Sequence, residues 1–171
     1  MCKLVKPSAE KPWLKYFSEE VREASVPQNT IYRHLRENNE NGRGDTALNY
    51  FGRKISYGML LDEVDKAAGA FAAAGIKKGD IVAAATVTIP EMVYALYGLN
   101  KIGAAPLIID PRTSAAGAMS FIKETGAKIF IVIDLYYEVL KDALFESGVE
   151  KIVVISADTS LPKSIRFLKQ L

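Results

Sequence analysis

The sequence predicts an α/β domain in which a mostly parallel sheet carries helices on both faces and follows a small hairpin. Short apolar, β-branched runs recur along the second half of the chain, and segments with helical spacing separate them. The runs begin 22 to 26 residues apart, which is the length of a strand plus a crossover helix. They lie at 81–85, 107–109, 129–133 and 152–155.

The segments between the runs predict the crossover helices. Glycine follows each of these segments a few residues before the next strand, where a helix end favours a residue in the left-handed region. The helix-face residues are Met92, Val93, Leu96 and Leu99, then Tyr137, Leu140 and Leu144, and the glycines are Gly103, Gly126 and Gly148.

Upstream of the first run, the sequence predicts a hairpin followed by a long helix. Segments 47–51 and 54–56 flank Gly52-Arg53, and glycine at the first central position is typical of a type II′ turn. Ser56 is a good N-cap for the helix, and Gly75 with Ile76 predicts a Schellman end.

The first 45 residues read as an arm with one short helix. We expect Thr30 to cap a helix that ends at Asn38, residues 39–45 to form a polar loop, and residues 1–29 to be irregular. The predicted division is therefore an arm with a short helix over 1–45, an α/β subdomain over 46–156, and a connecting segment over 157–171.

The tail from residue 157 allows two interpretations. Apolar and basic residues alternate there with the spacing of a basic amphipathic helix, which can touch a membrane surface or a partner. The interpretation we favour is a connecting segment whose apolar face packs on further protein. The residues concerned are Lys163, Ile165, Arg166, Phe167, Leu168, Lys169 and Leu171.

Composition excludes several classes of protein. The 171 residues are 49% hydrophobic and 25% charged, as in an ordinary globular domain, and the length favours one domain. The formal net charge of +2 provides no field to attract nucleic acid. Cys2 is the single cysteine, which suits a reducing compartment, and no apolar run is long enough to cross a bilayer. We expect a cytoplasmic chain with no transmembrane segment.

An inventory of reactive residues excludes several mechanisms. His34 and Cys2 are the only residues of their types, so no zinc site of the usual Cys/His kind can form, and we expect His34 to be exposed on its helix. The nearest approach to a phosphate loop is the segment 98–103, which lacks the lysine and hydroxyl residue that such loops need. The acidic residues Asp62, Glu63 and Asp65 read as a solvated helix face.

The loop after the second run is the best-placed candidate site. Asp110, Pro111 and Arg112 follow directly on a predicted strand, and ligands of open parallel sheets bind beyond the carboxyl ends of strands. The alternative is a turn fixed by proline, with Thr113 or Ser114 as the cap of the next helix. From the residues alone, both interpretations stay open.

Three segments in the same order resemble the adenylate-forming superfamily, which comprises AMP-forming acyl-CoA synthetases, luciferases and peptide-synthetase adenylation domains. The segment 55–60 (ISYGML) is similar to its first core motif, and 99–110 (LNKIGAAPLIID) to its second. Between them, 67–80 resembles the family's passage of helix, glycine and Gly-Asp before a strand. Segments 11–16 (KPWLKY) and 30–32 resemble bacterial long-chain fatty-acid–CoA ligases in particular.

The resemblance implies part of the N-terminal subdomain of a ligase that uses ATP, Mg²⁺ and CoA. Such an enzyme joins a fatty acid or other carboxylate to AMP and then transfers the acyl group to CoA. The loop of Asp110, Pro111 and Arg112 would lie near the CoA path, and Arg112 suits a nucleotide phosphate. The matched segments otherwise correspond to scaffold in the family.

The family's catalytic motifs are missing from these 171 residues. The Ser/Thr/Gly-rich phosphate loop with its lysine, the Tyr-Gly-x-Thr-Glu segment, the ribose-binding Thr-Gly-Asp and the lysine of the lid have no counterpart here. We therefore expect no catalytic residue, no metal site, no tight cofactor binding and no activity in the chain alone, and we expect self-association through exposed surfaces.

Two rival functions remain. The first is a non-catalytic binding or interaction module with the same fold, which would cover the apolar patch around Ile165, Phe167 and Leu168 that a fragment would expose. The second is a different nucleotide-binding α/β domain, which would need a phosphate cradle that the sequence does not supply.

Overall fold

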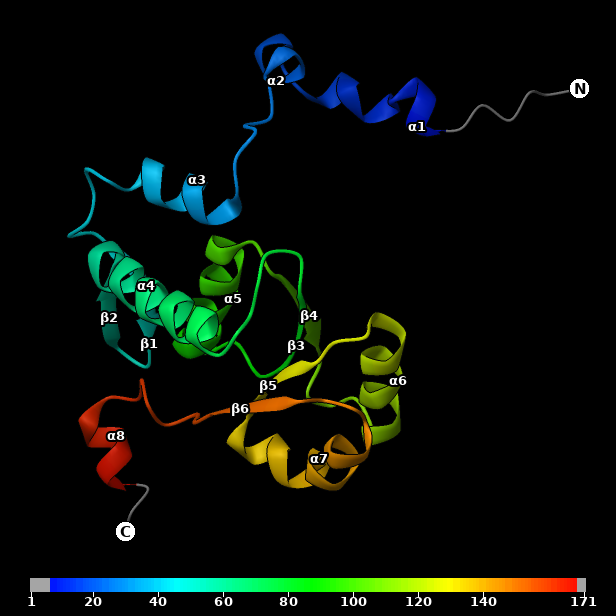
Figure 1. Cartoon of the computed structure of the whole chain (residues 1–171). Helices are drawn as coiled ribbons and strands as arrows, with labels where there is room; N and C mark the ends of the chain where they lie inside the picture. The colour runs from blue at the N-terminus through cyan, green and yellow to red at the C-terminus, as the bar shows by residue number, and fades with distance from the viewer. Residues whose placement is uncertain (1–6, 169–171) are drawn as a thin grey trace, which may run out of the picture.

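An exposed arm precedes the body of the molecule in this computed structural model, which describes the backbone of residues 7–168 and the side chains of residues 8–166 (Figure 1). The arm contains α1 (Pro7–Glu10), the 3-10 helix η1 (Pro12–Tyr16) and α2 (Glu19–Glu23). None of its side chains from residue 8 to residue 28 is buried. The expectation of an irregular arm is wrong for these three turns, because Pro12 starts η1 and Ser18 caps α2.

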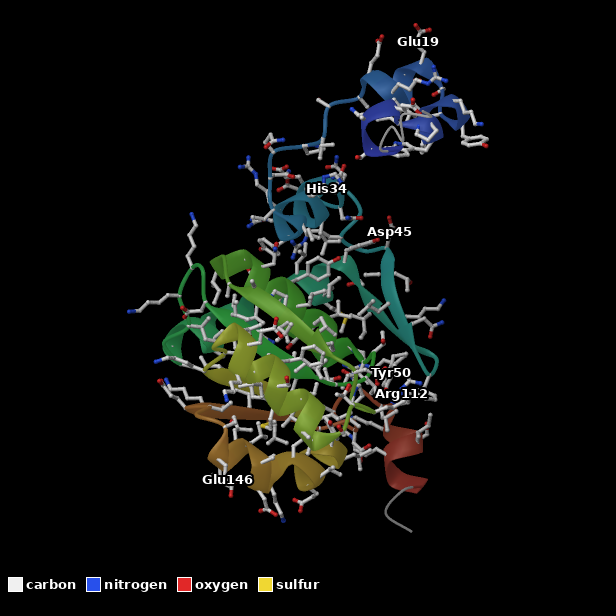
Figure 2. All side chains as sticks on the ribbon, turned by 90° about the vertical axis from the view of Figure 1, so that its right-hand side faces the viewer. Glu19, His34, Asp45, Tyr50, Arg112 and Glu146 are labelled. Atoms are coloured by element: carbon white, nitrogen blue, oxygen red, sulfur yellow. The ribbon has the colours of Figure 1, made fainter. Side chains whose placement is uncertain are left out.

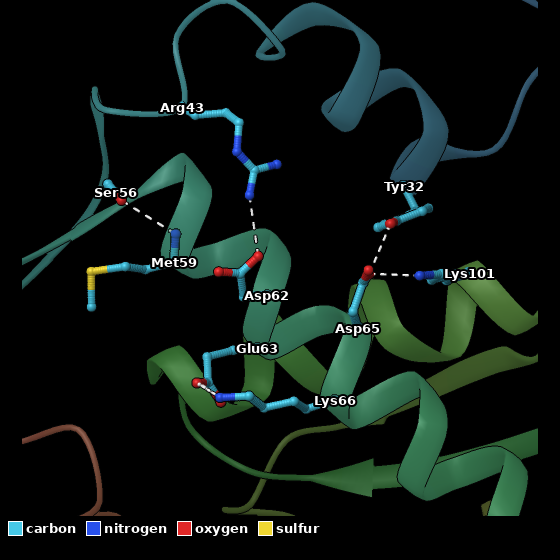
Figure 3. A network of polar contacts seen from close by, with 9 residues as sticks. All are labelled: Tyr32, Arg43, Ser56, Met59, Asp62, Glu63, Asp65, Lys66 and Lys101. Atoms are coloured by element: carbon cyan, nitrogen blue, oxygen red, sulfur yellow. Dashed lines mark hydrogen bonds and ion pairs between the residues drawn. The ribbon is translucent and has the colours of Figure 1, made fainter.

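Helix α3 (Ile31–Asn38) connects the arm to the body. The Thr30 side chain accepts a hydrogen bond from the Arg33 N–H at 3.1 Å, which confirms the predicted cap. Tyr32 is its buried residue, and the Tyr32 hydroxyl donates to Asp65 at 2.9 Å. Lys101 also donates to the same oxygen of Asp65, at 2.6 Å, so one carboxylate joins α3 to two other helices (Figure 3).

The hairpin pairs β1 (Thr46–Tyr50) with β2 (Arg53–Ser56) in antiparallel register. Tyr50 pairs with Arg53, so the two central turn residues are Phe51 and Gly52. Both have positive φ, 49° and 82°, which defines a type I′ turn. The predicted type II′ turn at Gly52-Arg53 is therefore wrong by one residue, because the strand register places Phe51 in the turn.

Helix α4 (Tyr57–Ala73) begins and ends as the sequence predicts. Ser56 accepts a hydrogen bond from the Met59 N–H at 3.2 Å, as Figure 3 shows. At the other end, the Ile76 N–H donates to the Phe71 carbonyl and the Gly75 N–H to the Ala72 carbonyl, which is the Schellman pattern. Gly75 has a φ of 90°, a backbone conformation that is unfavourable for any residue with an L side chain.

Four parallel strands form the main sheet in the order β4-β3-β5-β6. The connecting helices alternate with them along the chain, as the run spacing predicts. The strands are β3 (Ile81–Ala85), β4 (Ala105–Ile109), β5 (Ile129–Ile133) and β6 (Lys151–Ile155), and the helices are α5 (Pro90–Ile102), α6 (Ala115–Thr125) and α7 (Asp134–Glu146).

Helices cover both faces of this sheet, which confirms the predicted fold class. Alternate residues of each strand point to opposite faces, so each strand contributes to two cores. Val82 and Ile131 pack towards α4 and α5, whereas Ala83 and Phe130 pack towards α6 and α7. Figure 1 shows α4 and α5 on one side of the strands and α6 and α7 on the other. All five residues of β5 are buried, as expected for a strand in the interior of a parallel sheet.

Strand β4 lies at an edge of the sheet and carries a proline. The Ala105 N–H donates to the Asp80 carbonyl on the β3 side, at 2.8 Å, so the next residue faces the open edge. That residue is Pro106, which has no N–H to offer a further strand. The edge therefore lacks one of the donors that strand addition would use.

Helices α4 and α5 pack closely because a glycine lies between them. A Cβ at Gly98 would stand 3.1 Å from both the Ala67 Cβ and the Ala68 backbone nitrogen. The chain continues after β6 into α8 (Lys163–Leu168). Of the predicted patch residues, Ile165 is half-buried, and Phe167 and Leu168 lie outside the described side chains. None of the helices over residues 7–168 is long and apolar enough to cross a bilayer.

Candidate functional site

The carboxyl ends of the four strands define the candidate site. From β3 the chain passes through α5 to β4 on one side, whereas from β5 it passes through α7 to β6 on the other. Because these connections diverge, β3 and β5 flank the switch point at which open α/β sheets bind ligands. The loop that follows β4 lies at the same edge of the sheet.

Asp110 and Arg112 form a two-residue ion pair in this loop. The Arg112 Nη2 lies 2.5 Å from Asp110 Oδ2, and the Arg112 Nε lies 3.0 and 3.1 Å from the two carboxylate oxygens. The Arg112 backbone N–H also donates to Asp110 Oδ1 at 2.9 Å, which is an Asx-turn around Pro111. The structure therefore joins two of the three predicted site residues directly.

The ion pair changes the acidity of both partners. Side-chain and backbone hydrogen bonds from Arg112 lower the pKa of Asp110 from 3.8 to about 2. The hydrogen bond and charge of Asp110 in turn raise the pKa of Arg112. The carboxylate thus stays ionised at neutral pH and holds the guanidinium in one place.

Neighbouring groups fix both ends of the loop. The Thr113 N–H donates to the Asp110 carbonyl at 2.8 Å, and Ser114 caps α6 by accepting from the Gly117 N–H at 3.2 Å. The hydroxyl of the buried Tyr136 on α7 donates to the Thr113 carbonyl. Burial raises the pKa of Tyr136, and the charge of Asp110 raises it further. The turn interpretation with Ser114 as the cap is therefore correct for the backbone of this loop.

The fixed turn leaves Arg112 available to an anion. Its side chain is 89% exposed, and a guanidinium has five N–H donors, of which Asp110 occupies only those on Nε and one on Nη2. The remaining N–H groups can donate to a phosphate or carboxylate in the two-pronged geometry that arginine favours. Figure 2 shows Arg112 on the body of the molecule, far from His34 on α3.

Two further polar residues lie at this edge, and sequence reasoning did not single them out. Thr86 follows β3 directly and is buried. Asp134 follows β5 directly, is half-buried, and accepts a hydrogen bond from the Leu135 N–H at 2.8 Å. The signal that identified Asp110, a polar residue after an apolar run, would have found both.

The other polar residues considered from the sequence make local contacts on the surface of their helices. His34 is exposed on α3 and its ring lies beside Asn38, as expected. Asp62 on α4 pairs with Arg43 of the preceding loop at 3.1 Å, and Glu63 pairs with Lys66 on the same helix at 2.7 Å (Figure 3). Within the described residues, no three His, Cys, Asp or Glu side chains come together to hold a metal ion.

Comparison with known sequences gives one family model and many relatives. The model of the AMP-binding enzyme family matches residues 35–169. The acetyl-coenzyme A synthetase of Streptomyces avermitilis is 34% identical over 160 residues, covering 84% of this chain and 24% of that protein. The long-chain-fatty-acid–CoA ligase of Bacillus subtilis is 23% identical over 155 residues, covering 90% and 28%. This chain thus spans about a quarter of the length of these relatives.

Solved structures share the fold. A long-chain-fatty-acid-CoA ligase from Archaeoglobus fulgidus superimposes with a TM-score of 0.70 at 20% identity, covering 77% of this chain and 28% of that one. An anthranilate CoA ligase in complex with anthranoyl-AMP gives a TM-score of 0.70 at 22% identity, covering 76% and 26%. Both solved structures thus contain the α/β architecture that the sequence predicts for this chain.

Proposed function

The chain belongs to the AMP-binding enzyme family, and on that premise we propose that it forms part of an ATP-dependent, AMP-forming acyl-CoA ligase. The family match over residues 35–169 is the observation that carries the proposal. The proposed substrate is a fatty acid, because a long-chain fatty-acid ligase is among the relatives and segment 11–16 resembles that class. The proposed location is the cytoplasm, which the single cysteine favours.

The proposed reaction has two steps. A carboxylate oxygen attacks the α-phosphorus of ATP, the bond to the bridging oxygen of the β-phosphate breaks, and pyrophosphate leaves. The sulfur of CoA then attacks the acyl carbonyl carbon, its thiol proton is lost, and AMP leaves with the oxygen that joined it to the acyl group. Both steps build negative charge on phosphate or carbonyl oxygens, which nearby donors stabilise.

We propose that the described residues contribute to binding CoA for the second step rather than to the first step. The resemblance implies Mg²⁺ together with ATP, and within residues 8–166 no three acidic, histidine or cysteine side chains come together to hold a metal ion. We propose that Arg112 donates to a phosphate of CoA, with Asp110 and Pro111 holding its position. Support comes from the place of this loop at the carboxyl edge and from the free guanidinium donors.

The same proposal divides the chain by role. Residues 1–45 form an arm and a short helix, 46–156 the α/β subdomain, and 157–171 a connecting segment. We propose that the 171 residues alone do not catalyse adenylation, because they contain no phosphate loop with its lysine.

Two measurements test these proposals. The purified chain should show no ATP–pyrophosphate exchange with acetate or palmitate, and exchange above the enzyme-free background would refute the proposed inactivity. Millimolar CoA should shift the amide signals of residues 110 and 112–114 in an NMR titration more than pantetheine does, since pantetheine lacks the phosphates. Arg112→Gln should remove that difference and Arg22→Gln should keep it; equal shifts by both compounds in the unmodified chain would refute the phosphate contact.

A further inference from the structure

Tyr136, in the first turn of α7, reaches the candidate loop from a different part of the sheet. The side chain is buried in the core that the strands form with α6 and α7. Its hydroxyl donates a hydrogen bond to the Thr113 carbonyl, 23 positions earlier in the chain. Thr113 follows β4 whereas Tyr136 follows β5, and β3 lies between these two strands. The hydrogen bond therefore joins the two sides of the switch point.

Thr113 is held from two helices at the end of the loop. On the α6 side its methyl group lies over Gly117, where an added Cβ would stand only 2.9 Å from it. On the α7 side its carbonyl accepts from Tyr136. Its own N–H donates to the Asp110 carbonyl at 2.8 Å. A displacement of Thr113 would therefore displace the turn that carries Arg112.

Contacts within the loop set its shape rather than its place. The ion pair and the Asx-turn of Asp110 and Arg112 lie inside the turn itself. The cap at Ser114 joins the turn to α6, which follows it directly along the chain. The hydrogen bond from Tyr136 instead comes from α7, so it sets the distance between the turn and the other side of the switch point.

The Tyr136 hydroxyl keeps its proton at neutral pH. Burial raises the pKa of Tyr136 above its ordinary value of 10, and the charge of Asp110 raises it further. The hydroxyl therefore remains a donor to Thr113 throughout the neutral range. Phenylalanine at this position would remove the donor and keep the ring that the core needs.

We propose that Tyr136 is a positioning residue, which holds the loop where the guanidinium of Arg112 meets a phosphate of CoA. This inference rests on the proposed binding of CoA by Arg112. A loop without the hydrogen bond would occupy several positions, and the apparent affinity falls with the fraction of time spent in the competent one. Since one hydrogen bond shifts such an equilibrium roughly two- to tenfold, we expect the same factor in the affinity for CoA.

The test compares Tyr136→Phe with Tyr137→Phe in the full chain. Tyr137 is a matched control because it is half-buried and packs against the same core from the next position on α7. The ¹H–¹⁵N heteronuclear NOE of the amides of residues 112–114 and of the Arg112 Nε–H reports the order of the loop without ligand. NMR titrations with CoA and with pantetheine report binding.

Tyr136→Phe should lower these NOE values and weaken CoA binding roughly two- to tenfold, without a change for pantetheine. Tyr137→Phe should change neither readout. Unchanged NOE values in Tyr136→Phe would overturn the proposal, and so would lowered values with an unchanged affinity in a chain that prefers CoA to pantetheine. A lower thermal midpoint with both NMR readouts unchanged would assign the hydroxyl to stability alone and would equally overturn it.

Failure of the proposed function gives a different result. If the unmodified chain binds CoA and pantetheine equally, the contact of Arg112 with CoA is refuted and positioning for CoA is refuted with it. The NOE values measured without ligand then still decide whether Tyr136 holds the loop in place.

Discussion

The side-chain oxygen of Asn100 accepts a hydrogen bond from the backbone N–H of Tyr32 at 2.9 Å. The two residues are 68 positions apart, and the N–H belongs to the first turn of α3, which has no partner within its own helix. Asn100 on α5 therefore caps a helix of the N-terminal region and ties it to the body.

Asn100→Ala should loosen α3. The substitution leaves the partly buried N–H of Tyr32 unsatisfied, which costs about 1 kcal/mol. Chemical denaturation should show that loss, and amide exchange at Tyr32 should accelerate roughly five- to tenfold. Asn29→Ala, which removes only an exposed contact with Glu37, should leave the exchange rate at Tyr32 unchanged. Unchanged exchange in Asn100→Ala would show that the hydrogen bond contributes nothing.

Two glycines inside helices should respond in opposite directions to alanine. Gly69 on α4 has open space where a Cβ would stand, so Gly69→Ala should stabilise the chain by about 0.5–1 kcal/mol through helix propensity. Gly98→Ala should instead destabilise it by about 1 kcal/mol, because overpacking against the α4 backbone outweighs the same gain. Urea denaturation of the two variants measures both changes in the free energy of unfolding. Stabilisation by both substitutions would contradict the prediction and would mean that α4 and α5 move apart enough to accept the extra Cβ at little cost.

The ion pair of Asp110 and Arg112 should be visible in a pH titration. Since its folded pKa is about 2, Asp110 adds to stability above its ordinary pKa of 3.8, and this contribution disappears as the pH falls through about 2. Arg112→Gln should move the carboxyl midpoint in an NMR titration back towards 3.8, incompletely because the backbone N–H of residue 112 remains. Arg112→Lys keeps the charge but loses the two-pronged guanidinium geometry, so its carboxyl midpoint should lie between those of the unmodified chain and of Arg112→Gln. A midpoint unaffected by Arg112→Gln would assign the low pKa to the backbone alone.

The type I′ turn predicts a specific cost at Gly52. Its φ of 82° is unfavourable for an L side chain, so Gly52→Ala should destabilise the chain by about 1 kcal/mol. Gly44→Ala is the control, because a Cβ meets nothing there and its φ is not in the left-handed region. Thermal denaturation should show a lower midpoint for Gly52→Ala and an unchanged midpoint for Gly44→Ala. Equal midpoints would indicate that the turn changes type on substitution.

The hairpin also shows how far local sequence determines local structure. Glycine at position 52 predicts a tight turn, but Phe51 carries no signal for a positive φ. The pairing of Tyr50 with Arg53 places Phe51 in the turn, and Asn49 supports it by accepting from the Gly52 N–H at 3.1 Å. Strands β3 and β5 have the predicted bounds because their apolar runs are sharply delimited. Strand β4 begins earlier than predicted, because Pro106 interrupts the apolar, β-branched pattern at its start.

The candidate site was predictable in position and not in its contacts. An aspartate after an apolar run locates the loop at Asp110, and Ser114 follows as a cap with ordinary sequence signals. The hydrogen bond from Tyr136 to Thr113, like that between Asn100 and Tyr32, joins distant segments that only the folded chain brings together. The burial of the two carboxylate oxygens of the half-buried Glu91 is also a property of packing, because a glutamate after a proline at a helix start usually faces solvent.

The strand order has a consequence for synthesis on the ribosome. Strand β3 is made first but lies between β4 and β5, so one side of it stays open after β4 has paired. At about 5–20 residues per second, that side waits roughly 1–5 s after β4 for β5 to be made. During this interval a second nascent chain could pair with β3, whereas the proline in β4 protects the opposite edge. The order of the strands thus makes the interval between the synthesis of β4 and that of β5 a period in which β3 is exposed to misassembly.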